Sequence, residues 1–536
     1  MANASSSTAT LAAPSKRRPL VPIVLVALET AALAGLQYAE AAEWLSPANA
    51  MLAKLSSVGL TLILLFLWFV LFGPAARAVR IRVAIAAAVL AAIGMATLRI
   101  EGVSGDIVPR LRFRWSPQAD QTLAKITSGG DSADTVNLAE TTQDDYAQFM
   151  GPNRLGTLSG VSLARDWSEA PPKQLWRQPI GAAWSAFSIV GPYAITQEQR
   201  GDEELITCYE VATGKTRWAH STPVRFEETL AGIGPRATPT VVDGKVYAMG
   251  AKGHVTCLDG ATGKPLWQRD VVTETQAVPP IWGKSCSPLI LDNLVIVSAG
   301  GSAGKSLVAL DRTSGEMVWT GGNDASSYSS PFYVTLCGVP QVVIANAKTV
   351  AGHDPADGRV LWQESWPAGA LERDTASPNV SQPVAVGDDR LLLTKGYGEG
   401  AALWKIKHEG DAWSVEQLWR NNNLKTKFTS AVIRDGFAYA LDEGVLECVE
   451  IDSGRKVWKR GKYGHGQVLL IDDVLLVQSE DGDVALVEAS PHAYRELTRF
   501  HAIDGTCWNP PALSGRKLLV RSNEEAACYE LPAASP

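Results

Sequence analysis

The sequence predicts an all-β protein, an eight-bladed β-propeller, preceded by N-terminal transmembrane α-helices. Three observations predict it: a repeated strand–turn–strand unit, an incomplete unit at each end of the repeat region, and long apolar segments in the first hundred residues. The 536 residues include 17 Trp against 11 Phe and 12 Tyr, so indoles outnumber each of the other two aromatic side chains. This excess indicates that one repeated position of the architecture requires tryptophan.

The repeat combines a small residue, an acid, a glycine and a tryptophan. Five segments share small-x-acid-x-x-x-Gly-x-x-x-Trp, and they lie at 208–218, 257–267, 309–319, 352–362 and 448–458. Degenerate copies lie at 403–419 and 486–500. An alternating strand ends at the acid, glycine supplies the positive φ of the turn, and a second strand carries the indole. We expect each indole to fill space on a neighbouring unit.

The spacing of the repeats predicts propeller blades. Trp or its substitute occurs at 176, 218, 267, 319, 362, 419, 458 and Phe500, and a further pair of strands precedes each hairpin, as at 237–250 and 287–300. Four strands per period of this length are typical of blades. Residues 173–178 form an outer strand without a hairpin before it, and 527–531 form a third strand without a partner after it. Paired, they complete an eighth blade and leave no exposed sheet edge, which predicts a propeller over residues 145–536. The irregular copy at 403–419 leaves a count of seven blades open.

Residues 1–100 predict a membrane anchor of about three transmembrane helices, at 19–36, 55–73 and 82–98. Residues 55–72 contain no charge and are long enough to cross most of a hydrocarbon core. The first segment carries Glu29, and a cleaved signal peptide is its alternative interpretation.

The loop charges predict the topology of the anchor. Basic clusters precede the first span and separate the second from the third, at Lys16, Arg17, Arg18, Arg77, Arg80 and Arg82. Such clusters stay in the cytoplasm. We therefore expect a multi-pass protein of the inner (cytoplasmic) membrane, with a polar linker over 101–144 and the propeller on the periplasmic, extracytoplasmic side.

Candidate binding residues lie where the inner strands of the blades begin, at the mouth of the funnel. They are aromatic, cationic or amide side chains: Trp184, Arg236, Lys284, Tyr328, Asn379, Lys427, His465 and Trp508. A planar anionic ligand such as a tricarboxylate quinone would suit this ring, through ion pairing and stacking. A solvated channel rim closed by polar residues would contain the same residue types, so both interpretations stay open.

The repeat resembles the tryptophan-docking repeat of the pyrroloquinoline quinone (PQQ) propeller superfamily over about residues 145–531. Residues 146–154 (YAQFMGPNR) look like the lead-in of bacterial membrane-attached PQQ-like propellers. The superfamily includes quinoprotein alcohol and sugar dehydrogenases and also BamB-like, non-enzymatic scaffolds of outer-membrane protein assembly. The resemblance therefore implies the fold more strongly than the function.

Two features favour the scaffold over the enzyme. None of the seven cysteines is adjacent to another, whereas many quinoprotein alcohol dehydrogenases carry a vicinal pair. No matched segment supplies the family's catalytic base or calcium ligands, so no catalytic or metal-binding residue is carried over. We expect a BamB-like module that binds an envelope protein or peptide. The alternative is a dehydrogenase that uses PQQ with calcium, oxidises an alcohol or sugar and reduces membrane quinone. The net charge of −7 argues against nucleic acid as a partner.

Overall fold

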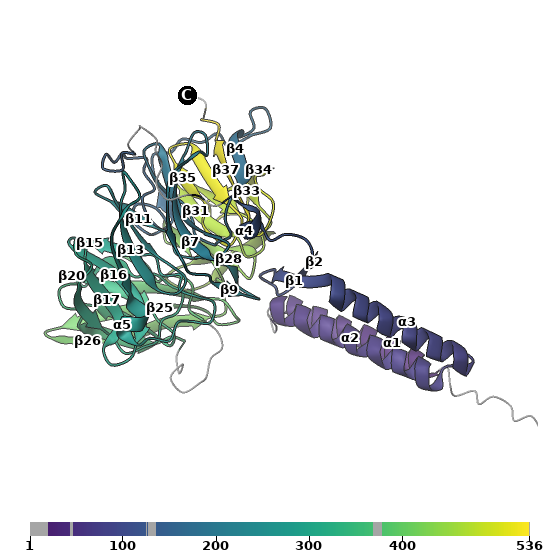
Figure 1. The fold of residues 1–536 in the computed structure, drawn as a ribbon. Coiled ribbons are helices and arrows are strands. Elements are labelled where there is room, and N and C mark those ends of the chain that lie inside the picture. Colours follow the sequence, from purple (N-terminus) through teal and green to yellow (C-terminus); the bar gives the residue numbers. More distant parts are fainter. Residues whose placement is uncertain are drawn as a thin grey trace, which may run out of the picture. The chain divides into compact units, whose positions relative to one another are not determined.

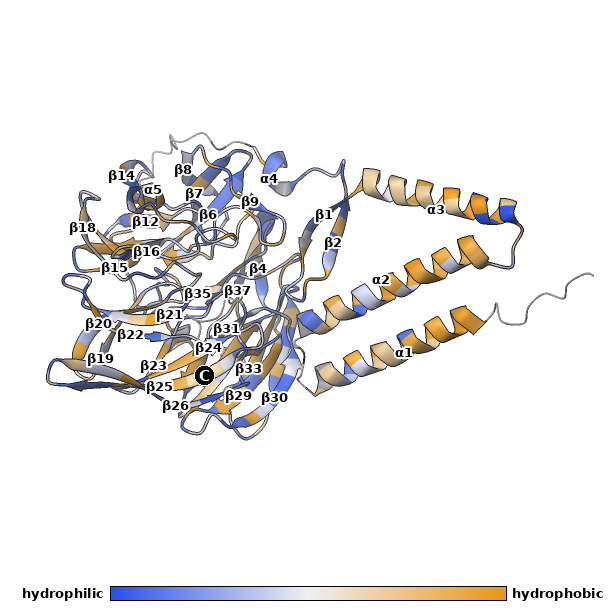
Figure 2. Ribbon diagram, turned by 90° about the horizontal axis from the view of Figure 1, so that it is seen from below, coloured by the Kyte–Doolittle hydropathy of each residue, from blue (hydrophilic) through white to orange (hydrophobic). Residues whose placement is uncertain are grey.

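The computed structural model describes residues 20–42, 45, 47–124, 126, 136–367 and 378–534, in two compact units that divide at residue 116 (Figure 1). The first unit contains α1 (Leu20–Ala41), α2 (Pro47–Phe72) and α3 (Arg77–Thr97), followed by a hairpin of β1 (Leu98–Val103) and β2 (Pro109–Phe113). All three helices are long and apolar enough to cross a membrane, and Figure 2 shows their hydrophobic character. α2 and α3 begin several residues before the predicted spans, because the helical hydrogen bonding extends beyond the apolar segments. The prediction of N-terminal helices able to span a membrane is confirmed.

Glu29 in α1 is paired with α2. Its carboxylate accepts hydrogen bonds from the hydroxyls of Ser57, at 3.0 Å, and Thr61, at 2.8 Å. A carboxylate among apolar side chains is stabilised only when such partners satisfy it. The charge in the first predicted span is therefore compatible with a helix packed against its neighbour.

The predicted linker over 101–144 contains defined structure at both ends. β2 lies within it, and α4 (Ala119–Thr122) follows. Val136 and Leu138 are buried in the apolar cluster between the first two blades of the second unit. Residues 125 and 127–135 of the linker lie outside the described residues.

Eight sheets of the second unit each form one blade, and in blades 1 to 6 the strands lie in chain order. Blade 1 contains β5 (Ser188–Val190), β6 (Tyr193–Arg200), β7 (Glu203–Glu210) and β8 (Thr216–Thr222). Blade 2 contains β11 (Thr240–Val242), β12 (Lys245–Met249), β13 (His254–Asp259) and β14 (Pro265–Asp270). Blade 3 contains β15 (Leu289–Leu291), β16 (Leu294–Gly301), β17 (Lys305–Asp311) and β18 (Met317–Gly321). Blade 4 contains β19 (Phe332–Leu336), β20 (Val339–Ala345), β21 (Thr349–His353) and β22 (Val360–Ser365).

Blades 5 to 8 repeat the arrangement. Blade 5 contains β23 (Val384–Val386), β24 (Arg390–Lys395), β25 (Gly400–Glu409) and β26 (Ala412–Asn421). Blade 6 contains β27 (Val432–Arg434), β28 (Phe437–Asp442), β29 (Val445–Glu450) and β30 (Lys456–Lys462). Blade 7 contains β31 (Gln467–Ile471), β32 (Val474–Gln478), β33 (Asp483–Glu488) and β34 (Glu496–His501), and β3 (Thr157–Leu158) adds a parallel strand to β31. Blade 8 contains β35 (Ala512–Ser514), β36 (Lys517–Arg521), β37 (Glu525–Glu530) and β4 (Lys173–Pro179). The connection between blades 1 and 2 contains a short hairpin of β9 (Glu227–Glu228) and β10 (Gly232–Ile233). The connection between blades 2 and 3 contains α5 (Val271–Thr275).

The ring closes by pairing its two ends. β4, from the start of the propeller, pairs antiparallel with β37 from its end, so that Trp176 lies opposite Cys528. The first strands of neighbouring blades contact one another in blades 1 to 4 and between blades 6 and 7, and β35 of blade 8 contacts β5 of blade 1. The predicted eight-bladed propeller is therefore confirmed, and the count of seven is excluded.

The repeated indoles dock from each blade onto the next. In six blades the indole Nε1 donates a hydrogen bond of 2.7 to 3.1 Å to a backbone carbonyl of the next hairpin, in the pairs Trp176–Val211, Trp218–Gly260, Trp267–Arg312, Trp319–Pro355, Trp419–Ile451 and Trp458–Ser490. The motif glycine lies under the ring, and a Cβ at Gly263 would come within 2.6 Å of Trp218. Glycine is required here by the positive φ of the turn and also by the neighbouring indole.

Two blades depart from the pattern. Trp362 donates instead to Oε1 of Gln341 in its own blade, at 2.6 Å, and the next hairpin has Glu409 where the motif glycine would lie. The prediction that Phe500 occupies the tryptophan position of blade 7 is wrong. The register of β33 and β34 places Thr498 opposite Leu486, and Phe500 two residues further along.

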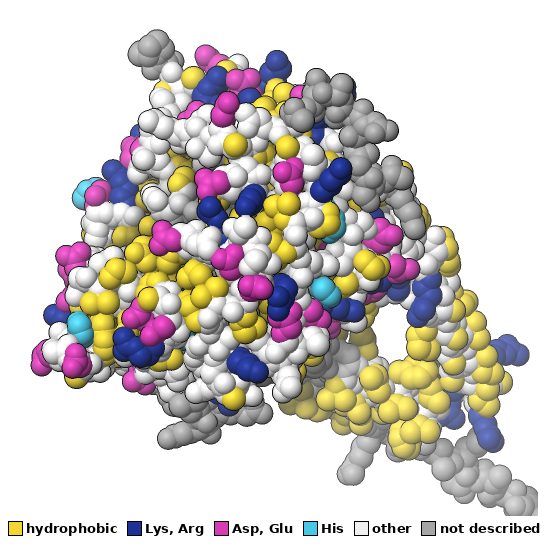
Figure 3. Space-filling model, turned by 60° about the vertical axis from the view of Figure 1, so that its left-hand side comes forward, with side chains coloured by type: hydrophobic (Ala, Val, Ile, Leu, Met, Phe, Trp, Pro, Cys, Tyr) yellow, Lys and Arg dark blue, Asp and Glu magenta, His cyan; other side chains and the backbone are white. Residues whose placement is uncertain are grey.

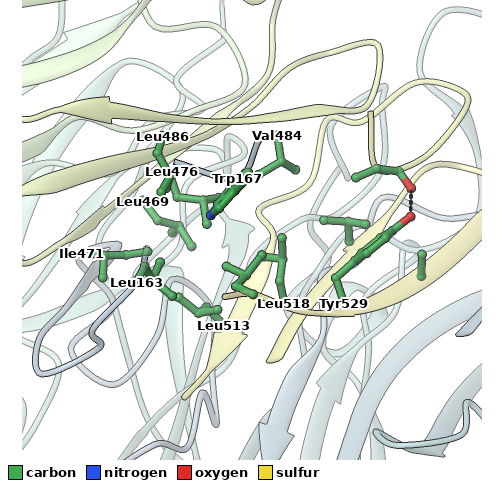
Figure 4. Close-up of a cluster of buried hydrophobic side chains, with 14 of the residues drawn as sticks. Leu163, Trp167, Leu469, Ile471, Leu476, Val484, Leu486, Leu513, Leu518 and Tyr529 are labelled. Atoms are coloured by element: carbon green, nitrogen blue, oxygen red, sulfur yellow. Dashed lines mark hydrogen bonds between the residues drawn. The ribbon is translucent and has the colours of Figure 1, made fainter. Parts of the chain in front are cut away.

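An indole from outside the repeat packs against blade 7. Trp167 is buried among Leu476, Leu486 and their neighbours (Figure 4). Its ring meets Phe500 edge-on at 5.5 Å, and its backbone N–H donates to Oγ1 of Thr498 at 3.2 Å. The segment before β4 therefore supplies the aromatic group that the seventh repeat lacks.

Candidate functional site

The candidate site is the end of the ring where the first strands of the blades begin, which we call the mouth. The connections between blades meet there, and side chains tie them together. Gln467 at the start of β31 donates from Nε2 to the carbonyls of Phe428, at 2.8 Å, and Trp508, at 2.7 Å. The starts of three successive first strands, in blades 6, 7 and 8, are thereby held side by side.

The lead-in segment 146–158 crosses the ring away from the mouth. Its hydrogen bonds reach the first strands of blades that lie on opposite sides of the axis, namely Tyr146 with Ile189, Ala147 with Val241, Arg154 with Ser287 and Pro288, and Gly156 with Leu470. Blades 3 and 7 face each other across an eight-membered ring, so a segment bonded to both must pass through the axis. This arrangement restricts a ligand of the ring to the mouth.

Arg154 holds this segment in place. Its guanidinium is buried and donates to the carbonyls of Ser287, at 2.8 Å, and Pro288, at 3.0 Å. Burial lowers the pKa of Arg154 to about 10. The part of the sequence that resembles a lead-in motif therefore acts as a structural plug.

Four of the predicted site residues lie in one aromatic cluster. The Trp508 ring packs between those of Trp184, at 4.7 Å, and Phe428, at 4.6 Å. Phe428 meets His465 edge-on at 5.9 Å, and the Lys427 Nζ lies 5.8 Å from the centre of the same ring. Blades 1, 6, 7 and 8 thus contribute to one continuous set of rings.

Arg236 and Tyr328, two further predicted site residues, lie outside this cluster and contact other groups of the blade connections. The Arg236 guanidinium lies 4.3 Å from the centre of the Phe226 ring and donates to the carbonyls of its own connection, including Ala231 at 2.9 Å. Burial lowers the pKa of Arg236 to about 10, although Tyr328 and two glutamates oppose the shift. The Tyr328 hydroxyl accepts a hydrogen bond from the backbone N–H of Trp282 at 3.1 Å. Burial raises the pKa of Tyr328.

Lys284 and Asn379 have side chains that bond to the backbone of neighbouring segments. The fully buried Lys284 Nζ donates to the carbonyls of Ser298, at 3.2 Å, and Ala299, at 2.5 Å, and burial lowers its pKa to about 8. Nδ2 of Asn379 donates to the carbonyl of Asn346 at 2.7 Å. Both side chains fasten blade connections, which is a structural role.

Several mouth residues lie outside the predicted set because they come from other turns. Glu480 accepts hydrogen bonds from the Trp508 indole, at 2.9 Å, and from the backbone N–H of His465, at 3.1 Å. Burial raises the pKa of Glu443, against the effect of His465 and Lys427. Glu443 follows a second strand and Glu480 lies just beyond another, and the sequence analysis considered only the starts of first strands.

This set of side chains is a poor match for a tricarboxylate quinone held with calcium. Arg236 and Lys284 donate to backbone carbonyls, Lys427 lies over two aromatic rings, and Glu443 and Glu480 add carboxylates where the ligand would bring three more. Within the described ranges no group of three His, Cys, Asp or Glu side chains could hold a metal ion. We therefore assign no cofactor-dependent step to the mouth.

Comparison with known proteins supports the similarity that the repeat indicates. Residues 201–460 match the family model described as outer membrane protein assembly factor BamB. The resemblance stated from the repeat is confirmed. No curated protein sequence matches the chain.

Solved structures show the same fold at low identity. BamB from Moraxella catarrhalis is 15% identical, with a TM-score of 0.49, and the match covers 67% of this chain and 100% of the BamB chain. The quinohemoprotein alcohol dehydrogenase from Comamonas testosteroni is 10% identical, with a TM-score of 0.54, and covers 73% of this chain and 81% of its own. A europium-containing methanol dehydrogenase is 11% identical, with a TM-score of 0.54, and covers 72% of this chain and 90% of its own. At such identities the dehydrogenases share the fold alone, so function must be argued from the site.

Proposed function

We propose that this protein is a membrane-anchored scaffold of the cell envelope whose propeller mouth binds another protein on the extracytoplasmic side of the inner membrane. One observation carries the proposal: two adjoining connections at the mouth, 222–236 and 277–286, expose large apolar side chains. Val278 is 81% exposed, Ile281 74% and Leu230 44%. Large apolar side chains exposed on neighbouring segments are typical of protein-binding surfaces.

The two connections are packed against each other and are held in place. A Cβ at Gly283 would lie 2.9 Å from the Phe226 ring, so this ring packs against the backbone of the other connection. Arg225 forms an ion pair of 2.7 Å with the buried Asp120, and Pro279 and Pro280 restrict the backbone between Val278 and Ile281. A surface ordered before binding loses less conformational entropy when a partner arrives.

Mixed surface charge favours a protein partner over a polyanion. On the face shown in Figure 3, basic and acidic side chains are interspersed, with hydrophobic side chains between them. Apolar side chains that project from a turn can enter pockets of a partner, which is how most binding energy is concentrated in protein interfaces. This chemistry agrees with the expected envelope protein or peptide.

The sidedness of the proposal rests on the basic clusters beside the helices. Arg77, Arg80 and Arg82 lie at the start of α3, so its other end and all that follows are extracytoplasmic. Alkaline phosphatase fused after residue 120 is expected to be active in cells. An inactive fusion at this position, with an active one between α2 and α3, would reverse the topology.

Site-specific photocrosslinking tests the proposed binding surface. A photoreactive amino acid at Val278 or Ile281 of the full chain is expected to capture one protein of defined mass in cells. Val318 provides the matched control, because it is 53% exposed and lies on β18, an outer strand. The double variant Val278→Asp with Ile281→Asp should reduce co-purification of that partner at least tenfold, whereas Val318→Asp should not. Equal capture from position 318, or none from 278 and 281, would overturn the proposal.

A dehydrogenase remains the alternative that the shared fold raises. Dye-linked oxidation of alcohols and sugars, measured after addition of PQQ and calcium, discriminates the two functions. We expect no turnover above the protein-free control. Sustained turnover that is lost on removal of calcium would show that the protein is a dehydrogenase and would overturn the scaffold proposal.

A further inference from the structure

The β1–β2 hairpin directly follows α3, since the helix ends at Thr97 and β1 begins at Leu98. Its register places Leu98 opposite Phe113, and Ile100 opposite Leu111. Because side chains of a strand alternate between the two faces, these four apolar residues share one face. The same alternation puts arginines on the other face, where Arg99 lies opposite Arg112.

The apolar face of the hairpin is exposed. Leu111 is 59% exposed and Trp115, which follows the strand, 67%. The rings of Phe113 and Trp115 stack at 4.9 Å. A two-stranded sheet with such a face is marginally stable in water, so it requires an apolar surface to cover it.

The arginine face is fixed to the end of α3. Arg114 donates from Nε to the carbonyls of Met95 and Leu98, at 3.1 Å each, where the last carbonyls of a helix have no helical partner. Arg112 forms an ion pair of 2.8 Å with Glu101. Residues 98–116 contain four arginines against two acids, so the hairpin is cationic.

We propose that this hairpin lies in the surface of the bilayer that α3 crosses, with its apolar face at the boundary of headgroups and acyl chains and its arginines at lipid phosphates. Three features point to lipid as the occupant: continuity with a helix long enough to span, a cationic face that complements phosphate, and an exposed aromatic pair at the helix end. Amphipathic elements of this kind enter the interface by about 5–10 Å. The inference rests on the proposed crossing of the membrane by α3.

Fluorescence quenching in lipid nanodiscs tests the position of the hairpin in the full chain. A nitrobenzoxadiazole label on Leu111→Cys is compared with the same label on Ile93→Cys in α3 and on Val318→Cys in the propeller, two positions of similar exposure. Six of the seven native cysteines are buried and Cys337 is half-buried, so labelling of the parent chain gives the background. Brominated lipids are expected to reduce the emission at 111 and at 93 about twofold or more, and to leave that at 318 unchanged.

The outcomes separate the hairpin from the anchor. Quenching at 93 but not at 111 would overturn the hairpin inference and leave the anchor standing. Absence of quenching at both positions would overturn both. A label at 111 that neither brominated lipid nor aqueous iodide reaches would show that protein covers the face, from this chain or a second copy, and would also overturn the inference.

Discussion

Replacement of a motif glycine by alanine tests the docking of indoles between blades. Gly263 has a φ of +70°, and a Cβ there would come within 2.6 Å of Cε3 of Trp218. Alanine in this conformation costs about 1–2 kcal/mol. Displacement of the indole adds about 1 kcal/mol for its 2.9 Å hydrogen bond to Gly260 and, if a quarter of its ~200 Å² returns to water, about 1 kcal/mol more. Gly263→Ala should therefore lower the free energy of unfolding by roughly 3–4 kcal/mol.

Gly410→Ala is the matched control for this prediction. Gly410 also lies in a hairpin between third and fourth strands with a positive φ, of +62°, but nothing lies within 4 Å of its Cβ position. It should therefore lose only the backbone contribution, about 1–2 kcal/mol. Urea unfolding of the full chain in detergent, followed by near-ultraviolet circular dichroism, measures both. Equal losses in the two variants would refute the argument that the neighbouring indole requires the glycine.

Two further predictions concern blades 6 and 7. Trp167→Ala should destabilise the propeller by about 3–4 kcal/mol, because it leaves a cavity beside Phe500. Trp413 in β26 is only partly buried and stacks on His408 at 4.0 Å, so Trp413→Ala should lower stability by less, about 1–2 kcal/mol. Urea midpoints compare the two variants, and similar values would contradict the assigned role of Trp167. Burial and the neighbouring Asp442 raise the pKa of Glu447 to about 8, so the folded state keeps a proton that the unfolded chain releases above about pH 4.5. Stability should fall as the pH rises from 5 to 8, and Glu447→Gln should remove on the order of 2 kcal/mol of that fall, as measured by unfolding at both pH values; an unchanged pH dependence would exclude Glu447 as its cause.

The repeat predicted the blades because one local pattern carries both the turn and the contact between neighbours. The glycine, the small residue and the indole of 257–267 perform in the structure the roles that their spacing predicts. The pattern did not predict the tryptophan position of blade 7 correctly. Whether Thr498 or Phe500 lies opposite Leu486 depends on where the strand bulges, and a shift of two residues leaves the alternation unchanged. The contribution of Trp167 comes from a segment more than 300 residues away, and no local pattern could reveal it.

The candidate site was predictable in position and less so in its chemistry. The starts of the first strands do bring Trp184, Trp508 and His465 to one cluster, through the rings of Trp508 and Phe428. Whether a cation faces the axis or the neighbouring backbone depends on the exact path of each connection. Lys284 is the clear example, since its ammonium group bonds to carbonyls of β16. The sequence places such a residue at the mouth but does not indicate which groups its side chain contacts there.

The closed end of the ring changes how the mouth should be understood. A ring open at both ends would let solvent fill the axis, and a polar rim would then need no ligand. Here Arg154 is buried and bonded to blade 3, while Gly156 in the same segment bonds to Leu470 of blade 7, so the axis is occupied by protein. A buried guanidinium is stable only when carbonyls satisfy its donors, and this makes the lead-in part of the fold rather than part of the tether. The exposed apolar side chains of the mouth therefore lie on a ring whose axis is closed by protein. This arrangement suits a docking face and does not suit a channel.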